Sequence, residues 1–166
     1  MNLTFRNVRE DERGILCDLL ERTYRPLKDL NEHPWIPADD LWQSYDDQVF
    51  DNLSEELIML TELDRSVVGF ASYNLIHRGA VIGRNTVLPE HGGKGIGTAQ
   101  VREIIRRCRD AGAEVIHVLT GDHPFFERAQ RMYLKCGFNE VDRSDDGNGI
   151  GRTLIRYRLD LTEEGD

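Results

Sequence analysis

The sequence lacks the run of roughly 18 apolar residues that a membrane-spanning helix needs, so we expect no membrane partner. Its N-terminus has no continuous apolar core of signal-peptide length, and we therefore expect a cytoplasmic protein. Cysteine is scarce as well: Cys17, Cys108 and Cys136 lie far apart and form no C-x-x-C pair, which excludes a disulfide framework and a zinc ribbon. The five histidines have no metal-ligand spacing, so we expect no metal site.

Proline is also infrequent, and the charge is predominantly acidic. With 5 prolines and 39% hydrophobic residues, the composition is that of a folded protein rather than a disordered one. The length of 166 residues predicts a single domain over residues 1–166. Lys and Arg number 21 against 30 Asp and Glu, and the net charge is −9. This balance argues against nucleic acid as a partner and leaves cationic small molecules open.

The spacing of apolar residues predicts a mixed-sheet α/β domain. Helices are expected over residues 11–24, from about 40 to 50, 98–111 and 124–135. Strands are expected over residues 3–8, 57–63, 67–76, 80–88, 115–119, 138–141 and 153–161. Residues 25–40 are expected to be irregular, and a turn over 144–149 joins the last two strands. The predicted order of elements is therefore β-α-α-β-β-β-α-β-α-β-β.

The most informative segment is a glycine-rich loop between a strand and a helix, Gly92-Gly93-Lys94-Gly95-Ile96-Gly97. Glycines leave amide N–H groups unshielded, and the start of a helix adds unpaired N–H groups and a positive dipole end. Such a loop is suited to binding phosphate. The spacing disfavours two common phosphate loops: Lys94 is not followed by Ser or Thr, as a Walker A loop requires, and no G-x-G-x-x-G match is complete.

Two segments carry a resemblance to a known family. Val87-Leu88-Pro89-Glu90-His91-Gly92-Gly93-Lys94-Gly95-Ile96-Gly97-Thr98 resembles the acyl-CoA-binding motif of the GNAT superfamily of N-acetyltransferases, in which V-x-P precedes Q/R-x-x-G-x-G/A. Ala129-Gln130-Arg131-Met132-Tyr133-Leu134-Lys135-Cys136-Gly137-Phe138 is similar to the family segment A-x-x-x-Y-x-x-x-G-F. The resemblance implies a GNAT-like α/β fold with a mixed, largely antiparallel central sheet flanked by helices.

The resemblance also implies an enzymatic activity and the residues that carry it out. The enzyme would transfer an acetyl group from acetyl-CoA, by direct attack, to a primary amine of a small-molecule or peptide acceptor. The thioester would lie between strands 82–88 and 115–119, and Tyr133 would donate a proton to the leaving thiolate. The residues implied in cosubstrate binding are Val87, Leu88, Gly92, Gly93, Lys94, Gly95, Ile96, Gly97 and Thr98.

The general base is left open by the sequence. The candidates are His117, Asp122, His123, Glu32 and His33, and water alone is the remaining alternative.

Three positions depart from the family pattern. Gly92 stands at the Q/R position, Phe126 stands where an Asn is often found, and Arg84-Asn85-Thr86 lacks a carboxylate that some members carry. These departures keep a second function open, that of a non-catalytic CoA-binding sensor or interaction module. The resemblance is also compatible with a homodimer, because dimers are common among relatives.

Overall fold

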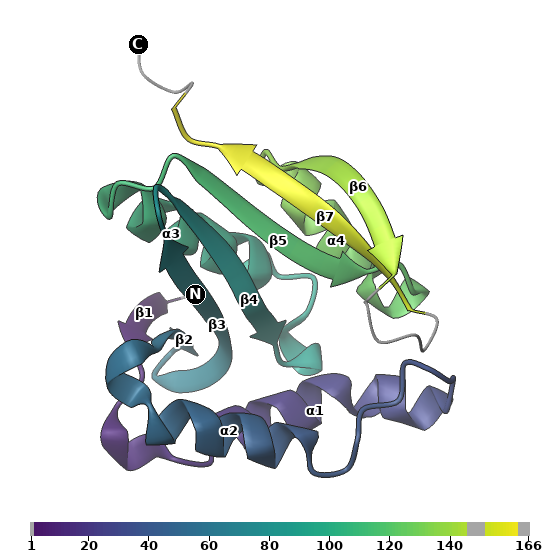
Figure 1. The fold of residues 1–166 in the computed structure, drawn as a ribbon. Helices are drawn as coiled ribbons and strands as arrows, with labels where there is room; N and C mark the ends of the chain where they lie inside the picture. Colours follow the sequence, from purple (N-terminus) through teal and green to yellow (C-terminus); the bar gives the residue numbers. More distant parts are fainter. Residues whose placement is uncertain (1, 146–151, 163–166) are drawn as a thin grey trace.

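The computed structural model describes residues 2–145 and 152–162, which form one seven-stranded sheet with helices on both faces (Figure 1). The strand order is β1-β2-β3-β4-β5-β7-β6, and β4 and β5 are parallel while all other neighbours are antiparallel. The strands are β1 Leu3–Asn7, β2 Leu57–Leu63, β3 Ser66–Ile76, β4 Gly79–Val87, β5 Val115–Gly121, β6 Asn139–Asp145 and β7 Thr153–Asp160. The predicted mixed, largely antiparallel sheet and the predicted order of elements are confirmed.

Two pairs of helices divide the core into two clusters. The helices are α1 Ile15–Leu30, α2 Leu41–Asp51, α3 Ile96–Asp110 and α4 Glu127–Lys135. Neighbouring residues of β2 point to opposite faces: Ile58 and Leu60 pack in the cluster that holds α1 and α2, whereas Met59 packs in the cluster that holds α3 and α4. Each helix pair therefore covers its own face of the sheet.

The parallel pair β4 and β5 separates part way along its length. Their pairing runs only from Gly79–Ile82 of β4 to Val115–Val118 of β5. Beyond these residues β4 stays paired with β3, and β5 stays paired with β7. The register between β3 and β4 shifts opposite Ser72, whose hydroxyl accepts the Arg84 N–H at 2.7 Å. This bulge turns β4 away from β5 and leaves the facing backbone edges of the two strands unpaired.

The first helix lies later in the chain than the sequence predicted. It spans Ile15–Leu30 rather than residues 11–24, so the first residues of the expected irregular stretch are helical. Its start is fixed by Asp46 of α2, a fully buried carboxylate that accepts the N–H groups of Leu16 and Cys17. Its last turns include Pro26 and are retained because Leu27 is buried there, so that tertiary packing overrides local preference.

Smaller differences concern element ends. The third helix begins at Ile96 rather than at residue 98, and β6 spans Asn139–Asp145 rather than residues 138–141. Part of the turn expected over residues 144–149 falls on 146–149, which lie outside the described residues. Within the described ranges, none of the helices has the length and apolar character needed to cross a membrane.

Candidate active site

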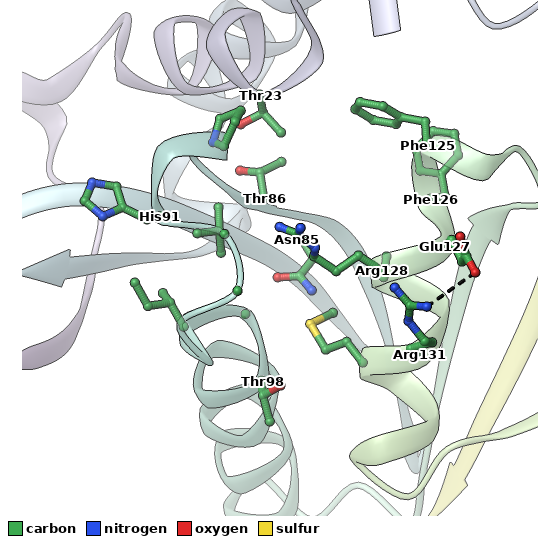
Figure 2. A pocket seen from close by; sticks show the side chains of 18 of the residues that line it. Thr23, Asn85, Thr86, His91, Thr98, Phe125, Phe126, Glu127, Arg128 and Arg131 are labelled. Atoms are coloured by element: carbon green, nitrogen blue, oxygen red, sulfur yellow. Dashed lines mark hydrogen bonds and ion pairs between the residues drawn. The ribbon is translucent and has the colours of Figure 1, made fainter. Parts of the chain in front are cut away.

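A pocket of about 680 Å³ lies beside the gap between β4 and β5, among α1, α4 and the loop that leads into α3 (Figure 2). A volume of this size suits a small-molecule ligand. Seven of the nine residues predicted to bind the cosubstrate line it: Val87, Gly92, Gly93, Gly95, Ile96, Gly97 and Thr98. Leu88 and Lys94 are not among the lining residues, and Leu88 is instead buried against the α1 and α2 cluster.

The loop before α3 presents backbone N–H groups to this pocket. Gly93 and Gly95 adopt left-handed conformations, with φ of 78° and 81°. The first backbone bond at the head of α3 is donated by Ala99 to the carbonyl of Gly95, over 3.0 Å. The N–H groups of residues 96–98 therefore have no backbone acceptor in the part of the chain that the structure describes. Such unpaired N–H groups and the positive end of a helix dipole favour a negatively charged ligand group at this position.

We expect Gly95→Ala to weaken the binding of acetyl-CoA by about tenfold. A Cβ at this position meets open space, but the φ of 81° is unfavourable for alanine by about 1 kcal/mol. We expect the loop to change its backbone conformation to relieve this strain, which moves its N–H groups away from the positions that bind the ligand. Gly112→Ala is the matched control, because Gly112 follows the other end of α3 with φ of 87° and equally open surroundings. Both variants should lose similar stability in thermal unfolding, and only Gly95→Ala should lose affinity in a titration. Equal affinity in both variants would count against a ligand role for the loop.

A buried amide on α3 orients the side chains next to the pocket. Gln100 is fully buried, and its Nε2 donates to the backbone carbonyls of Phe70 at 3.0 Å and Thr86 at 3.2 Å. Carbonyls can only accept, so the orientation of this amide is fixed, and Oε1 accepts the Thr61 hydroxyl at 2.7 Å. The same Nε2 lies 2.5 Å from Oδ1 of Asn85, a residue that lines the pocket. The amide nitrogen of Asn85 must therefore face away from Gln100.

That nitrogen donates to the hydroxyl of Tyr133 over 3.2 Å. Because the Tyr133 oxygen accepts this bond, its own proton is left to point elsewhere. Tyr133 is only 3% exposed and packs against Phe138 and Tyr157, so it lies behind Asn85 rather than among the lining residues. Burial raises the pKa of Tyr133 far above its ordinary value, and the bond from Asn85 offsets part of the rise. The phenol is thus a protonated donor at the edge of the pocket.

The side of the pocket formed by α1 was not foreseen from the sequence. Tyr24 lines it and stacks on Trp42, with ring centroids 5.0 Å apart. The ring of Tyr24 is also in tilted contact with Phe125, with centroids 5.7 Å apart. Burial raises the pKa of Tyr24, and the nearby Arg84 guanidinium lowers it. In the sequence, Tyr24 is the last residue of the helix expected over residues 11–24. No local signal indicates that it lies at a pocket, because the contacting residues come from distant segments.

His117 lies away from the pocket. It is on β5, on the face opposite Ile116 and Val118, which are buried in the α3 and α4 cluster. Burial lowers the pKa of His117, and the positive charges of Arg156 and Arg158 lower it further. The residue is therefore neutral at physiological pH, but it is not among the lining residues.

Two other candidate bases are brought together by the fold. Nε2 of His123 lies 2.5 Å from a carboxylate oxygen of Glu32, and its Nδ1 accepts the N–H of Phe125 at 3.1 Å. Since Nδ1 accepts, the neutral ring carries its proton on Nε2 and directs it to Glu32. Both ring nitrogens are occupied, so His123 has no free nitrogen for a substrate proton. Asp122 and His33 do not line the pocket either.

Comparisons with known proteins agree with this geometry. The sequence profile of the Acetyltransferase (GNAT) family matches residues 25–138. A search of curated protein sequences gave no match. Solved structures of similar fold include the ribosomal-protein-S18-alanine N-acetyltransferase from Escherichia coli, with a TM-score of 0.74 at 14% identity over 99% of this chain and 97% of that chain.

Two further structures contain a ligand. The PaiA N-acetyltransferase from Thermoplasma acidophilum, in complex with coenzyme A, has a TM-score of 0.71 at 15% identity over 96% of this chain and 100% of that chain. An acetyltransferase from Bacillus subtilis, in complex with CoA, has a TM-score of 0.67 at 20% identity over 96% and 99% of the two chains. At these identities the likeness concerns the fold, and it confirms the fold that the two sequence motifs implied.

Proposed function

Because the chain belongs to the acetyltransferase (GNAT) family, we propose that it transfers an acetyl group from acetyl-CoA to a primary amine of a small-molecule or peptide acceptor. One observation supports the proposal: the head of α3, the end of β4 beside the gap, and Asn85, whose amide is bonded to the phenol of Tyr133, all line a single pocket. The CoA complexes of the Thermoplasma acidophilum and Bacillus subtilis proteins support acetyl-CoA as the cosubstrate.

The backbone of β4 supports a role in orienting the thioester. The N–H of Leu88 donates to the Val68 carbonyl at 2.8 Å and so points toward β3. Successive N–H groups of a strand point in opposite directions, so the N–H of Val87 points into the gap on the β5 side. A donor there can hydrogen-bond a thioester carbonyl and stabilise the negative charge that develops on its oxygen during attack.

The proposed reaction balances without any further reagent. A primary amine has a pKa near about 10 and must first lose a proton, and the proposed acceptor is water, since none of the five predicted bases lines the pocket. The neutral nitrogen then attacks the carbonyl carbon, a C–N bond forms, the C–S bond breaks, and the nitrogen releases its second proton to water. The sulfur leaves with the electron pair and takes the proton of Tyr133, which solvent later replaces. The products are an acetamide and free CoA.

The proposal is tested by measuring thiol release from acetyl-CoA with a panel of amines. The panel should include polyamines, aminoglycosides, amino-acid derivatives and peptides with a free N-terminus, and mass spectrometry should identify the acetylated product. Release that requires one class of amine supports the enzyme. Tight binding of acetyl-CoA without release across the whole panel would instead favour the non-catalytic CoA-binding module.

A further inference from the structure

Arg128 extends from the first turn of α4 across the pocket toward the β4 side, where Asn85 lies (Figure 2). Among residues 2–145 and 152–162, no hydrogen bond or ion pair holds its guanidinium. Arg131, one turn further along the same helix and also at the pocket, is by contrast paired with the Glu127 carboxylate at 3.4 Å. Arg128 is therefore an uncompensated cation in a pocket.

The backbone conformation of Gly92 does not require a glycine. Its φ of −65° and ψ of 150° are open to any residue. A Cβ at this position, however, would collide with Nη1 of Arg128 and would lie 3.2 Å from the backbone oxygen of Pro89 and 3.4 Å from Cζ of Arg128. Gly93 and Gly95 differ, because their positive φ favours glycine while their surroundings are open. The guanidinium of Arg128 thus occupies the volume that a side chain at position 92 would need.

The local charge around the guanidinium is positive. The lining residues include three cations, Arg128, Arg131 and Lys135, and one carboxylate, Glu127, whereas the whole chain carries a net charge of −9. The unpaired N–H groups at the head of α3 line the same pocket. A planar guanidinium matches the oxygens of a phosphate group, which it binds through two parallel hydrogen bonds, and the unpaired amides of the same pocket favour the same group.

We propose that Arg128 is the side-chain cation that binds the diphosphate of acetyl-CoA, and that Gly92 leaves open the volume in which its guanidinium lies. The inference rests on the proposed function. The proposal accounts for the departure at Gly92 from the family pattern. In the family, the Q/R side chain comes from the loop itself, whereas here Arg128 of α4 occupies the same space. Positions 92 and 128 are then alternatives, and only one of them can hold a long side chain.

Equilibrium titrations with CoA and with dephospho-CoA, which keeps the diphosphate but lacks the 3′-phosphate, test this assignment. We expect Arg128→Ala to raise the Kd for both ligands by about 10- to 100-fold, the range for the loss of charge-assisted hydrogen bonds. The salt dependence of the affinity should fall as well, because one ionic contact is lost. Arg131→Ala, the matched control on the same helix, should change either Kd far less.

A substitution swap tests the relation between the two positions. Gly92→Arg alone should weaken CoA binding, because two guanidinium groups then compete for one volume. The double variant Gly92→Arg with Arg128→Ala should bind more tightly than either single variant. Arg128 is exposed, so its replacement by Ala should leave the thermal unfolding midpoint unchanged.

Three outcomes would overturn the inference. Unchanged CoA affinity in Arg128→Ala would remove its basis. A loss for CoA but not for dephospho-CoA would assign Arg128 to the 3′-phosphate rather than to the diphosphate. Failure of the unaltered protein to bind CoA would overturn the proposed function along with the inference, and so is distinguishable from the first two results.

Discussion

Replacing Tyr133 by Phe is expected to lower kcat for acetyl transfer by about 100- to 1,000-fold, the usual contribution of a positioned general acid. Without the phenol proton, the thiolate would have to leave unprotonated. The Kd for acetyl-CoA should change little, because Tyr133 lies behind Asn85 and outside the pocket lining. Stability should fall by about 1 kcal/mol, since the Asn85 amide loses its acceptor. Steady-state kinetics, a binding titration and thermal unfolding measure the three effects.

Two neighbouring tyrosines provide controls for this variant. Tyr157→Phe removes a hydroxyl from a buried ring 5.8 Å from Tyr133 and should leave kcat close to that of the unaltered protein. Tyr24→Phe removes the hydroxyl from a ring that lines the pocket. A large loss of kcat in Tyr24→Phe combined with normal kcat in Tyr133→Phe would assign the acid to the other phenol.

The pH dependence follows from the direction of the Tyr133 pKa. An ordinary tyrosine has a pKa of about 10, and burial raises that of Tyr133 further. A raised pKa means that the phenol keeps its proton below about pH 10, so kcat should have no falling limb from this group in that range. The rate should instead rise with pH as the acceptor amine loses its proton. A fall in kcat between about pH 7 and 9 that disappears in Tyr133→Phe would contradict the assignment.

Replacing Gly97 by Val is expected to raise the Kd for acetyl-CoA by at least about 100-fold. Gly97 lies in the first turn of α3 and lines the pocket, where a Cβ would be 2.9 Å from Sδ of Met132 and 3.8 Å from Cγ2 of Val87. A branched side chain fills the space between these groups, and excluding a ligand from it costs about 3 kcal/mol. The fold should be retained, because valine has a higher helix propensity than glycine.

Ala99→Val is the control for the Gly97 variant. It introduces the same branched side chain into the same helix, at a position outside the lining of this pocket. Its affinity for acetyl-CoA should stay near that of the unaltered protein. If the two variants bound acetyl-CoA equally well, the cosubstrate would have to lie elsewhere.

The parts of the fold that the sequence predicts well are those with strong local signals. The strand over residues 57–63 is reproduced at both ends because it is a mostly apolar run that stops at Asp64 and Arg65, two residues with positive φ. The glycine-rich loop and the following helix were predicted because their chemistry is contained in one short segment. Six of the binding residues predicted in this segment line the pocket.

The parts that could not be predicted depend on residues far apart in the chain. The start of α1 is fixed by Asp46, some 30 residues away, and no pattern in residues 11–24 reveals that contact. The orientation of Asn85 depends on Gln100. A glutamine on a helix is expected to be exposed, and only the structure shows that Gln100 is buried. The space beside Gly92 is occupied by Arg128, which comes from another helix. Each of these relations needs three-dimensional contacts that residue spacing does not encode.

A crystal structure of the protein with bound acetyl-CoA tests the account most directly. We expect the diphosphate oxygens within about 3.2 Å of the backbone N–H groups at the head of α3, the usual hydrogen-bond range. The thioester should lie in the gap between β4 and β5, with its sulfur within hydrogen-bond reach of the Tyr133 hydroxyl. Acetyl-CoA seated outside this pocket, or a thioester sulfur beyond hydrogen-bond reach of the Tyr133 hydroxyl, would contradict the account.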